Sequence, residues 1–468
     1  MTSHFIRLPD PIVAVTLVLC ACSIVTTNPL LTFVSILFVP FSMKMLWRTG
    51  EPPVLFFGVL LQWLTITVKV FYANYLGLVF TEVHQFPLQI EKTFWLSMLG
   101  LFFFTVSLHL VIRNLRFQSP ATIEQLVKYY DTTKVTYAYL ILFFAFPGII
   151  ALSRAIPGLQ QPLTKVMEMK WSFFYLLFLV VFLKKENRQN FYFIFVAEVI
   201  LGFTGYFSFF KDFIIIALIC YLTLGIRLQP LQYVALVILG AFTFNLAVVW
   251  TYVKPEYRAY LSGGEQAQIV TVSQTDALSK ILELSDKMTQ ENFDDAVVDL
   301  VNRVSYIDFF SASIAYVPAY LPHQGGAVWS ASVQHILLPR IFFPNKPAID
   351  DSQQTTKYTG LAFAGAEQGT SISLGYMAES YVDFGETYMF IPIVALGFLI
   401  GFIYKRVLTG SINKLWGYGL VMPLFFSVNI NGFASIKIIG GLVMYFLVVL
   451  LLNRFVLIHI DRLVRSKR

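Results

Sequence analysis

PRIFFPNKP (339–347) and TSISLGYMAESYVDFG (370–385) are the parts richest in candidate functional residues within the one long polar stretch of this chain of 468 residues. The polar stretch runs from Lys254 to Glu386. Long apolar runs precede and follow it, separated by short connections rich in Lys and Arg. It is therefore the only long part of the chain that water could dissolve, and the sequence around it is expected to lie in a membrane.

The composition supports a polytopic all-α membrane protein. Hydrophobic residues make up 57% of the chain and charged residues only 13%, whereas a soluble domain carries about 25% charged residues. The chain is expected to divide into membrane helices in residues 1–253, a large, partly helical polar loop in residues 254–386, and further membrane helices with a basic tail in residues 387–468.

The apolar runs predict about twelve membrane helices, since a helix needs roughly 20 apolar residues to cross a bilayer. They lie at approximately 11–27, 29–47, 53–79, 93–112, 134–153, 168–184, 190–209, 212–227, 231–252, 387–405, 414–430 and 434–455. Inside the polar loop, helices are expected at 275–290, 294–321 and 332–338. A further helix is expected from Tyr376 into the membrane run at 387–405.

The distribution of charge predicts the orientation. The chain has 27 acidic and 34 basic residues, of which 16 acidic and 8 basic lie between Lys254 and Glu386. This loop therefore carries a net charge of −8 and the remainder of the chain +15. Since Lys and Arg favour cytoplasmic loops, both termini are expected in the cytoplasm and the loop on the outer side. The basic excess lies in short connections between apolar runs, so no nucleic-acid partner is expected.

No sequence motif indicates a cofactor or a metal. The chain has no phosphate-binding glycine loop, no dinucleotide fingerprint, no serine-hydrolase or zinc-protease motif, and no metal-ligand spacing of Cys or His. An enzyme that works outside the cytoplasm has no nucleotide at hand, so it needs a substrate that arrives already activated. The membrane supplies such a substrate as a lipid pyrophosphate.

Five cations in the acidic loop are candidate phosphate ligands: Arg258, Arg303, Arg340, Lys346 and Lys357. Arginine suits phosphate because its planar guanidinium makes two hydrogen bonds at once. Arg340 and Lys346 lie among proline and aromatic residues, which would hold a cation in place. For Arg303 the alternative is a surface pair with Asp299, four residues earlier on the same predicted helix.

Lys211 interrupts a nearly continuous apolar run at the predicted outer turn between the seventh and eighth membrane helices. A lysine near a helix end in a membrane is costly unless it is paired or faces a polar cavity. It is a candidate anchor for a lipid-linked phosphate. The alternative is a turn residue that reaches water and pairs with Asp212.

Three residues are candidate proton acceptors. Glu379 and Asp383 are four residues apart, so on a helix they share one face at the mouth of the tenth membrane helix. Two such acids could hold a sugar hydroxyl and accept its proton, or they could simply keep the helix end in water. His323, in a predicted turn, is the third candidate base, while His335 and Glu367 are weaker.

Two short patterns resemble those of a known family. The first comprises Pro339-Arg340 and Pro344-Asn345-Lys346-Pro347, and the second comprises Gly375, Glu379, Tyr381, Phe384 and Gly385. Together with about twelve helices, a large late loop and a basic residue in an outer turn, they resemble the Wzy-type repeat-unit polymerases of O-antigens and exopolysaccharides. The motifs cover about fifty residues, whereas the similarity in architecture covers the whole chain.

The resemblance implies a GT-C-type glycosyltransferase in the bacterial cytoplasmic membrane. Its donor would be a glycan on undecaprenyl pyrophosphate, and its acceptor a lipid-linked repeat unit whose terminal hydroxyl attacks the donor. The cations above would stabilise the leaving pyrophosphate, Tyr381 would bind substrate, and an acid or His323 would take the proton. The implied partners are the lipid-linked glycan, membrane lipids, and a chain-length regulator and flippase of the same pathway.

Two alternatives stay open. An O-antigen ligase uses the same donor with a different acceptor, and it would show a catalytic histidine in its outer loop, for which His323 and His335 are candidates. A lipid-linked oligosaccharide transporter or flippase belongs to a different class and commonly shows two repeated halves. No such repeat is detectable in this sequence.

Overall fold

The computed structural model describes residues 8–115, 120–204, 210–224, 230–264, 270–338, 343, 350–365, 371–428 and 432–466. Helices provide the regular structure throughout these residues, and within them no β-strand forms beyond one isolated bridge between Tyr130 and Arg465. The prediction of an all-α fold is thereby confirmed for the described residues.

Among the described residues, eight helical segments are long and apolar enough to cross a membrane. They are Pro29–Leu46, Val54–Leu76, Pro87–Ile112, Thr132–Ser153, Gln160–Lys184, Leu231–Leu261, Phe390–Gly410 and Ser435–Val464. Each of the twelve predicted segments coincides with helical structure. Some of these helices are short, however. α1 (Asp10–Ser23) has 14 residues, which rise about 21 Å against a hydrocarbon core of about 30 Å. The count of twelve crossings therefore stays a prediction.

Four helices form a first packed group: α2 (Pro29–Leu46), α3 (Val54–Leu76), α4 (Ile90–Ile112) and α18 (Phe390–Gly410). α18 packs along α4 over most of its length. Their backbones approach closely because Gly397 has no side chain, and a Cβ there would collide with the Ser107 hydroxyl. Small residues at helix contacts are the usual basis of such packing in membranes.

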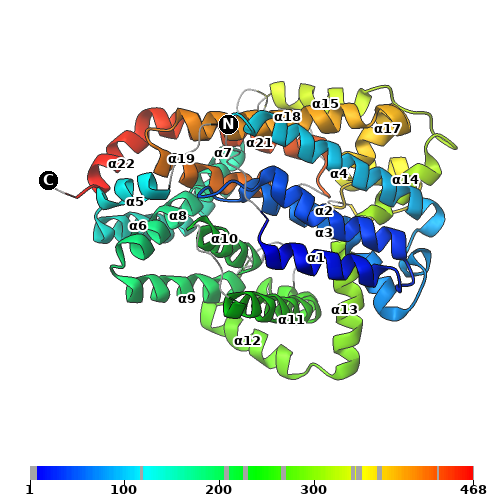
Figure 1. The fold of residues 1–468 in the computed structure, drawn as a ribbon, viewed down its shortest axis with the longest axis horizontal. Helices are drawn as coiled ribbons and strands as arrows, with labels where there is room; N and C mark the ends of the chain where they lie inside the picture. Colours follow the sequence, from blue (N-terminus) through cyan, green and yellow to red (C-terminus); the bar gives the residue numbers. More distant parts are fainter. Residues whose placement is uncertain are drawn as a thin grey trace.

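A second group of helices packs beside the first and extends to the C-terminus. It comprises α5 (Pro120–Lys128), α6 (Thr132–Ala155), α7 (Gln160–Glu168), α8 (Lys170–Lys184), α9 (Arg188–Thr204), α10 (Phe210–Thr223), α19 (Lys414–Val421), α20 (Phe425–Val428), α21 (Ser435–Leu451) and α22 (Leu457–Val464). The buried face of α8 packs against α6 and α19. Figure 1 shows α5, α6 and α22 at the left end of the molecule, beside the C-terminus.

The segment predicted as the polar loop folds into helices of its own. α11 (Pro230–Leu261) leads into it, and it continues with α12 (Gln274–Asp286), α13 (Gln290–Val304), α14 (Ile307–Tyr316), α15 (Ala327–Leu337), α16 (Asp351–Thr359) and α17 (Tyr376–Tyr388). α14 packs on α4, α15 on α21, and α13 on α11 and α3. In Figure 1, α14 and α17 lie toward the end of the molecule opposite the C-terminus.

Two predicted helices in this segment differ from the observed ones. The single helix expected over 294–321 is wrong, because the chain breaks at Ser305 and Tyr306, where the Tyr306 N–H donates to the Thr65 carbonyl of α3. The helix expected from Tyr376 into the membrane is interrupted at Gly385, whose φ of 68° and ψ of −173° are not helical. Only glycine adopts this backbone region readily.

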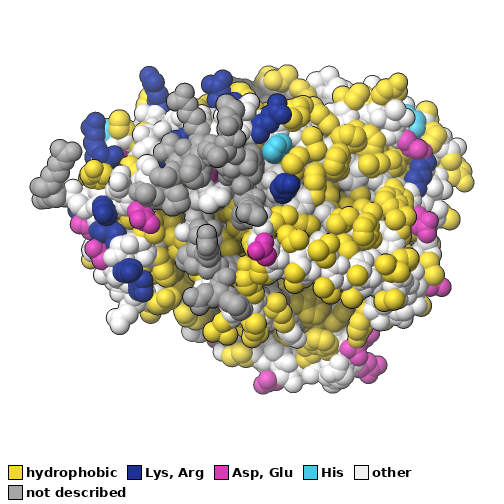
Figure 2. All heavy atoms as spheres, viewed as in Figure 1, with side chains coloured by type: hydrophobic (Ala, Val, Ile, Leu, Met, Phe, Trp, Pro, Cys, Tyr) yellow, Lys and Arg dark blue, Asp and Glu magenta, His cyan; other side chains and the backbone are white. Residues whose placement is uncertain are grey.

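The surface matches the composition of the chain. Figure 2 shows hydrophobic side chains over a broad part of one face, with Lys and Arg frequent toward the end where α22 lies. Many of the exposed hydrophobic side chains belong to the long apolar helices, for example Phe144 on α6 and Val237 on α11. A surface of this kind suits contact with lipid.

Candidate functional site

α17 presents Glu379 and Asp383 from one side, one helical turn apart. The helix is held in place at its first residue, where the Tyr376 hydroxyl donates to Gln62 Oε1 of α3 over 2.8 Å. Both carboxylates are buried, each with 1% of its surface exposed. Each lies at the N-terminus of a different helix, where unpaired backbone N–H groups are available.

Glu379 lies at the N-terminus of α21. Its Oε2 accepts the backbone N–H of Ser435, the first residue of that helix, over 2.7 Å. Burial raises the pKa of Glu379 to about 7, although hydrogen bonds from Ser435 act in the opposite direction; nearby Asp351 and Asp383 raise it further. A carboxyl group with a pKa near neutrality can both accept and return a proton at physiological pH.

Asp383 caps α15. Its Oδ1 accepts the N–H of Val328 over 3.0 Å, and its Oδ2 accepts the N–H of Trp329 over 2.9 Å. Burial raises the pKa of Asp383, and these backbone hydrogen bonds oppose that effect. Because both oxygens are engaged by one helix terminus, Asp383 is well placed to position α15 and poorly placed to take a proton from a substrate.

A pair of serine hydroxyls connects Glu379 with an open groove. Ser435 Oγ and Ser332 Oγ are 2.8 Å apart, and the Ser435 side chain also hydrogen-bonds Glu379. Ser332 lines a cavity of about 530 Å³ between α15, α16 and α21. The other lining residues are Gln324, Ala327, Val328, Ala331, Asp350, Gln353, Gln354, Lys357, Tyr358 and Ile436. We name this cavity the amide groove, after its three glutamines.

Next to Glu379, an acid and a lysine form an ion pair. Asp351, at the start of α16, is 1% exposed, and its Oδ2 lies 2.5 Å from Lys437 Nζ. Ser371 Oγ donates to the same oxygen over 3.3 Å. Lys437 lies on the first turn of α21, two residues after Ser435, and its side chain is 38% exposed. The Glu379 site therefore contains a cation, Lys437, that the sequence patterns did not indicate.

Two further predicted residues lie beside α17. The Tyr381 hydroxyl donates to the Val317 carbonyl over 3.1 Å, and the ring is buried at 2% exposure. His323 is exposed on the surface, and its ring meets Tyr381 edge to face at 5.3 Å. Tyr381 thus anchors the turn after α14. His323 lies at the Gly385 break, where its Nδ1 is 3.3 Å from the Val382 carbonyl oxygen.

A second polar cavity brings Arg258 and Arg303 together. It has a volume of about 570 Å³ and lies between α11 and α13. Its lining residues are Gln85, Thr251, Lys254, Pro255, Arg258, Asp299, Asn302 and Arg303. We name it the cationic groove, because three cations line it against one acid. In Figure 1, α13 and α15 lie on opposite sides of the fold, so this groove is separate from the amide groove.

A buried charged cluster lies next to the cationic groove. Asp308 Oδ2 is 3.2 Å from Lys69 Nζ, and Asp308 Oδ1 is 3.0 Å from His84 Nδ1 and accepts the Gln85 N–H. Burial alone would raise the pKa of Asp308, but His84 and Lys69 together hold it below its usual value. His84 Nε2 is buried and finds no hydrogen-bond partner among the residues that the structure describes.

This cluster went unpredicted, although the sequence carries a signal for it. Lys69 lies inside the apolar run at 53–79, and an ionisable residue in a membrane helix usually has a partner and a function. Asp308 likewise falls on the apolar stripe of its predicted helix. Sequence spacing could not pair the two, since 239 residues separate them.

Three predicted cations cannot be placed in either groove. Arg340 and Lys346 lie outside the described residues, in the segment that joins α15 to α16. The backbone of Lys211 belongs to α10, but its side chain is also outside the described part of the chain. Their predicted roles in binding phosphate stay predictions.

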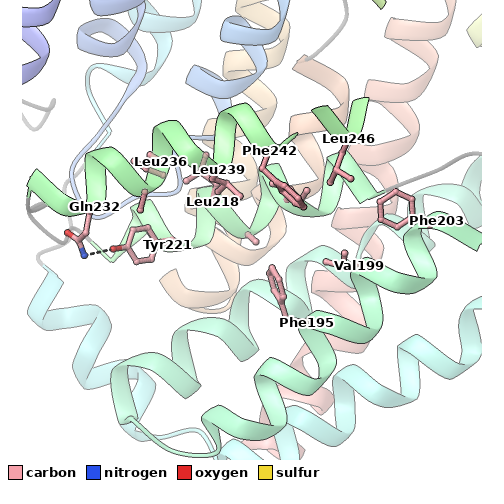
Figure 3. Close-up of a pocket in the computed structure, with 13 residues that line it drawn as sticks. Phe195, Val199, Phe203, Leu218, Tyr221, Gln232, Leu236, Leu239, Phe242 and Leu246 are labelled. Atoms are coloured by element: carbon pink, nitrogen blue, oxygen red, sulfur yellow. Dashed lines mark hydrogen bonds between the residues drawn. The ribbon is translucent and has the colours of Figure 1, made fainter. Parts of the chain in front are cut away.

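A third cavity is apolar. It measures about 520 Å³ and lies between α9, α10 and α11. Figure 3 shows Phe195, Phe242 and Leu246 among the side chains that line it. Gln232 Nε2 donates to the Tyr221 hydroxyl at one end over 2.9 Å. With a lining of this kind, the cavity suits a hydrocarbon chain.

In its described residues the protein is helical, with several helices long and apolar enough to span a membrane and a buried acid beside a polar groove. Residues 111–465 match the family model described as Domain of unknown function (DUF8712), and the chain belongs to this family. No curated protein and no solved structure matches the chain.

Proposed function

We propose that this protein is a membrane glycosyltransferase that joins lipid-linked oligosaccharide repeat units, as its resemblance to the Wzy-type polymerases implies. The observation that carries the proposal is Glu379, a buried carboxyl group with a pKa of about 7 that is connected through Ser435 and Ser332 to the amide groove. A general base for a sugar hydroxyl needs this combination of proton affinity and access to a sugar.

The amide groove has the chemistry expected of a glycan site. Glutamine side chains both donate and accept hydrogen bonds, which suits sugar hydroxyls, and Gln324, Gln353 and Gln354 line the groove. Its volume of about 530 Å³ lies within the range of about 300 to 1,000 Å³ typical of small-ligand sites. The groove thus has room for more than one sugar ring.

In the proposed reaction, the acceptor hydroxyl oxygen bonds to the anomeric carbon of the donor. The bond from that carbon to the diphosphate oxygen breaks, and the diphosphate leaves with the electron pair. The hydroxyl proton passes to Glu379 by way of the two serine hydroxyls. Lys357 lines the groove and Lys437 pairs with Asp351, and cations stabilise a leaving diphosphate.

The purified protein in liposomes provides the test. It is supplied with lipid-linked repeat units extracted from cells that lack the polymerase. Longer lipid-linked glycans, formed together with free lipid diphosphate in equal amounts, are expected. Movement of the intact substrate across the bilayer without any new glycosidic bond would overturn the proposal in favour of a transporter. Transfer to a different acceptor only would favour a ligase.

A further inference from the structure

The length of α11 is expected to bring the cationic groove to the level of lipid head groups. About 20 residues of helix span the hydrocarbon core, and α11 has 32 residues beginning at Pro230. If the apolar start of α11 enters the membrane, the core ends near Trp250 and Tyr252, and such aromatic residues favour the membrane interface. Lys254 and Arg258 follow within two turns, so they reach the depth of phosphate groups.

A polymerase reaction needs two places for a lipid diphosphate. The donor reacts at the carbon bonded to its diphosphate, so that diphosphate must lie close to the base. The acceptor reacts at the far end of its glycan, so its own diphosphate lies one repeat unit away. Figure 1 shows α15 and α17, which carry residues of the amide groove and Glu379, on one side of the fold, and α13, which carries Arg303 of the cationic groove, on the other.

We propose that the cationic groove holds the diphosphate head of the acceptor lipid, while the amide groove and Glu379 hold the reacting sugars. This inference rests on the proposed function and assigns to Arg258, Arg303 and Lys254 a substrate that is distinct from the donor.

The lining residues suit a diphosphate. Three cations, Lys254, Arg258 and Arg303, line the groove together with one acid, Asp299, and this excess of cations in the lining suits a head group of about −2. Two guanidinium groups can each make paired hydrogen bonds to phosphate oxygens. The side chains of Gln85 and Asn302 line the same cavity and can donate to the remaining oxygens.

Binding stoichiometry tests the site without any turnover. A fluorescent polyprenyl diphosphate is titrated into the purified chain in nanodiscs, with phosphatidylglycerol as a competing phosphate lipid. The wild-type chain is expected to bind two molecules and the double variant Arg258→Gln/Arg303→Gln one. Lys287→Gln is the matched control, because Lys287 is an exposed cation of the same acidic segment that pairs with Glu283. An unchanged stoichiometry in the double variant, or equal displacement by phosphatidylglycerol, overturns the proposal.

Kinetics decide which lipid the groove holds. In the double variant, the KM of the lipid-linked acceptor is expected to rise at least tenfold, since each lost charged contact costs more than about 1.4 kcal/mol. The KM of the donor, measured with an oligosaccharide acceptor freed from its lipid, is expected to stay at the value of the Lys287→Gln control. A rise in the donor KM instead would assign the groove to the donor and overturn this inference.

The same experiments separate the inference from the function on which it rests. Suppose that Glu379→Gln retains transfer and that the Arg258→Gln/Arg303→Gln variant binds one lipid where the wild type binds two. The base assignment then fails and the lipid site stands. Suppose instead that Glu379→Gln abolishes transfer and that the Arg258→Gln/Arg303→Gln variant still binds two lipids. The lipid site then fails and the base assignment stands.

Discussion

The carboxylate of Glu379 and the backbone nitrogen of Ser435 are 2.7 Å apart, so the first N–H of α21 donates to an acid that is 1% exposed. The helix N-terminus favours the ionised carboxylate, and burial favours the neutral acid. The outcome is a pKa of about 7. At this pKa the group changes its charge within the physiological range, unlike an ordinary surface glutamate.

Replacing Glu379 with Gln keeps the size of the side chain and an oxygen for the Ser435 N–H, but removes proton acceptance. Transfer is expected to fall by about 10² to 10⁴-fold, the usual contribution of a positioned base. The assay measures glycan length on purified protein, and cells are expected to accumulate single lipid-linked units. The matched control is Glu386→Gln, seven residues later on α17, where the acid is exposed and pairs with Lys92. Equal loss in both variants would contradict a special role for Glu379.

The pKa of Glu379 also predicts how activity depends on pH. A general base must be ionised, so transfer by the wild-type protein is expected to increase as the pH rises through about 7. A rate profile between pH 5 and pH 9, measured with the lipid-linked unit, tests this. A flat profile over that range would argue against Glu379 as the proton acceptor.

Stability is expected to show the opposite dependence. The pKa of Glu379 is raised in the folded chain from an ordinary value of 4.5 to about 7. Its contribution to stability is therefore complete below about pH 4.5 and is lost as the pH rises through about 7. Relative to Glu379→Gln, the wild type should lose on the order of 3 kcal/mol over this range. Thermal unfolding of both proteins in detergent at pH 5 and pH 8 measures the difference.

Asp383 is expected to act through structure. Asparagine keeps one acceptor oxygen for the backbone N–H groups of Val328 and Trp329, so Asp383→Asn should lose some stability but retain most of the transfer activity. Asp383→Ala should destabilise the protein by about 1 to 2 kcal/mol, because it leaves the buried N–H groups of Val328 and Trp329 without an acceptor. Unfolding temperature and transfer rate are measured on both variants. A loss of transfer in the Asn variant at normal stability would restore Asp383 as a candidate base.

Local sequence rules predicted the helices well and the tertiary contacts only in part. Apolar length located the membrane helices, and the spacing of four residues placed Glu379 and Asp383 on one side of α17. That each acid would meet the start of another helix depends on α15 and α21, which local spacing cannot bring together. The break at Ser305 and Tyr306 was missed for a similar reason, since a hydrogen bond to α3 overrides the helical pattern.

Because Lys69 and Asp308 form a buried ion pair, their mutations are expected to have strongly coupled effects on the free energy of unfolding. Asp308→Asn leaves the Lys69 ammonium, 1% exposed, without its carboxylate, and removing one partner of a buried pair costs about 3 to 5 kcal/mol. Lys69→Met should cost a similar amount, whereas the double variant should lose much less than the sum. Unfolding of the four proteins in detergent gives the coupling free energy, and simple additivity would contradict the pairing.

Cysteine labelling tests the predicted sidedness. Ser330 on α15 and Ser466 near the C-terminus are both exposed, so each is replaced by cysteine in a background that lacks the exposed Cys22. A membrane-impermeant maleimide added to intact cells is expected to label position 330 and not position 466. In inverted membrane vesicles the pattern should reverse. The same pattern in both preparations would refute the orientation derived from charge.

The Tyr306 ring lies against Gly432, and its hydroxyl donates to the Ser373 carbonyl over 2.5 Å. Tyr306 follows Arg303 by only three residues, so one short segment contacts both the cationic groove and the backbone beside Glu379. If α13 shifts when a lipid binds in the cationic groove, the Tyr306 ring would transmit the shift to the segment that precedes α17. By thermodynamic reciprocity, a lipid that alters the proton affinity of Glu379 must bind with an affinity that depends on whether Glu379 is protonated. Occupancy of the cationic groove by lipid and the protonation state of Glu379 would then be two measures of one equilibrium.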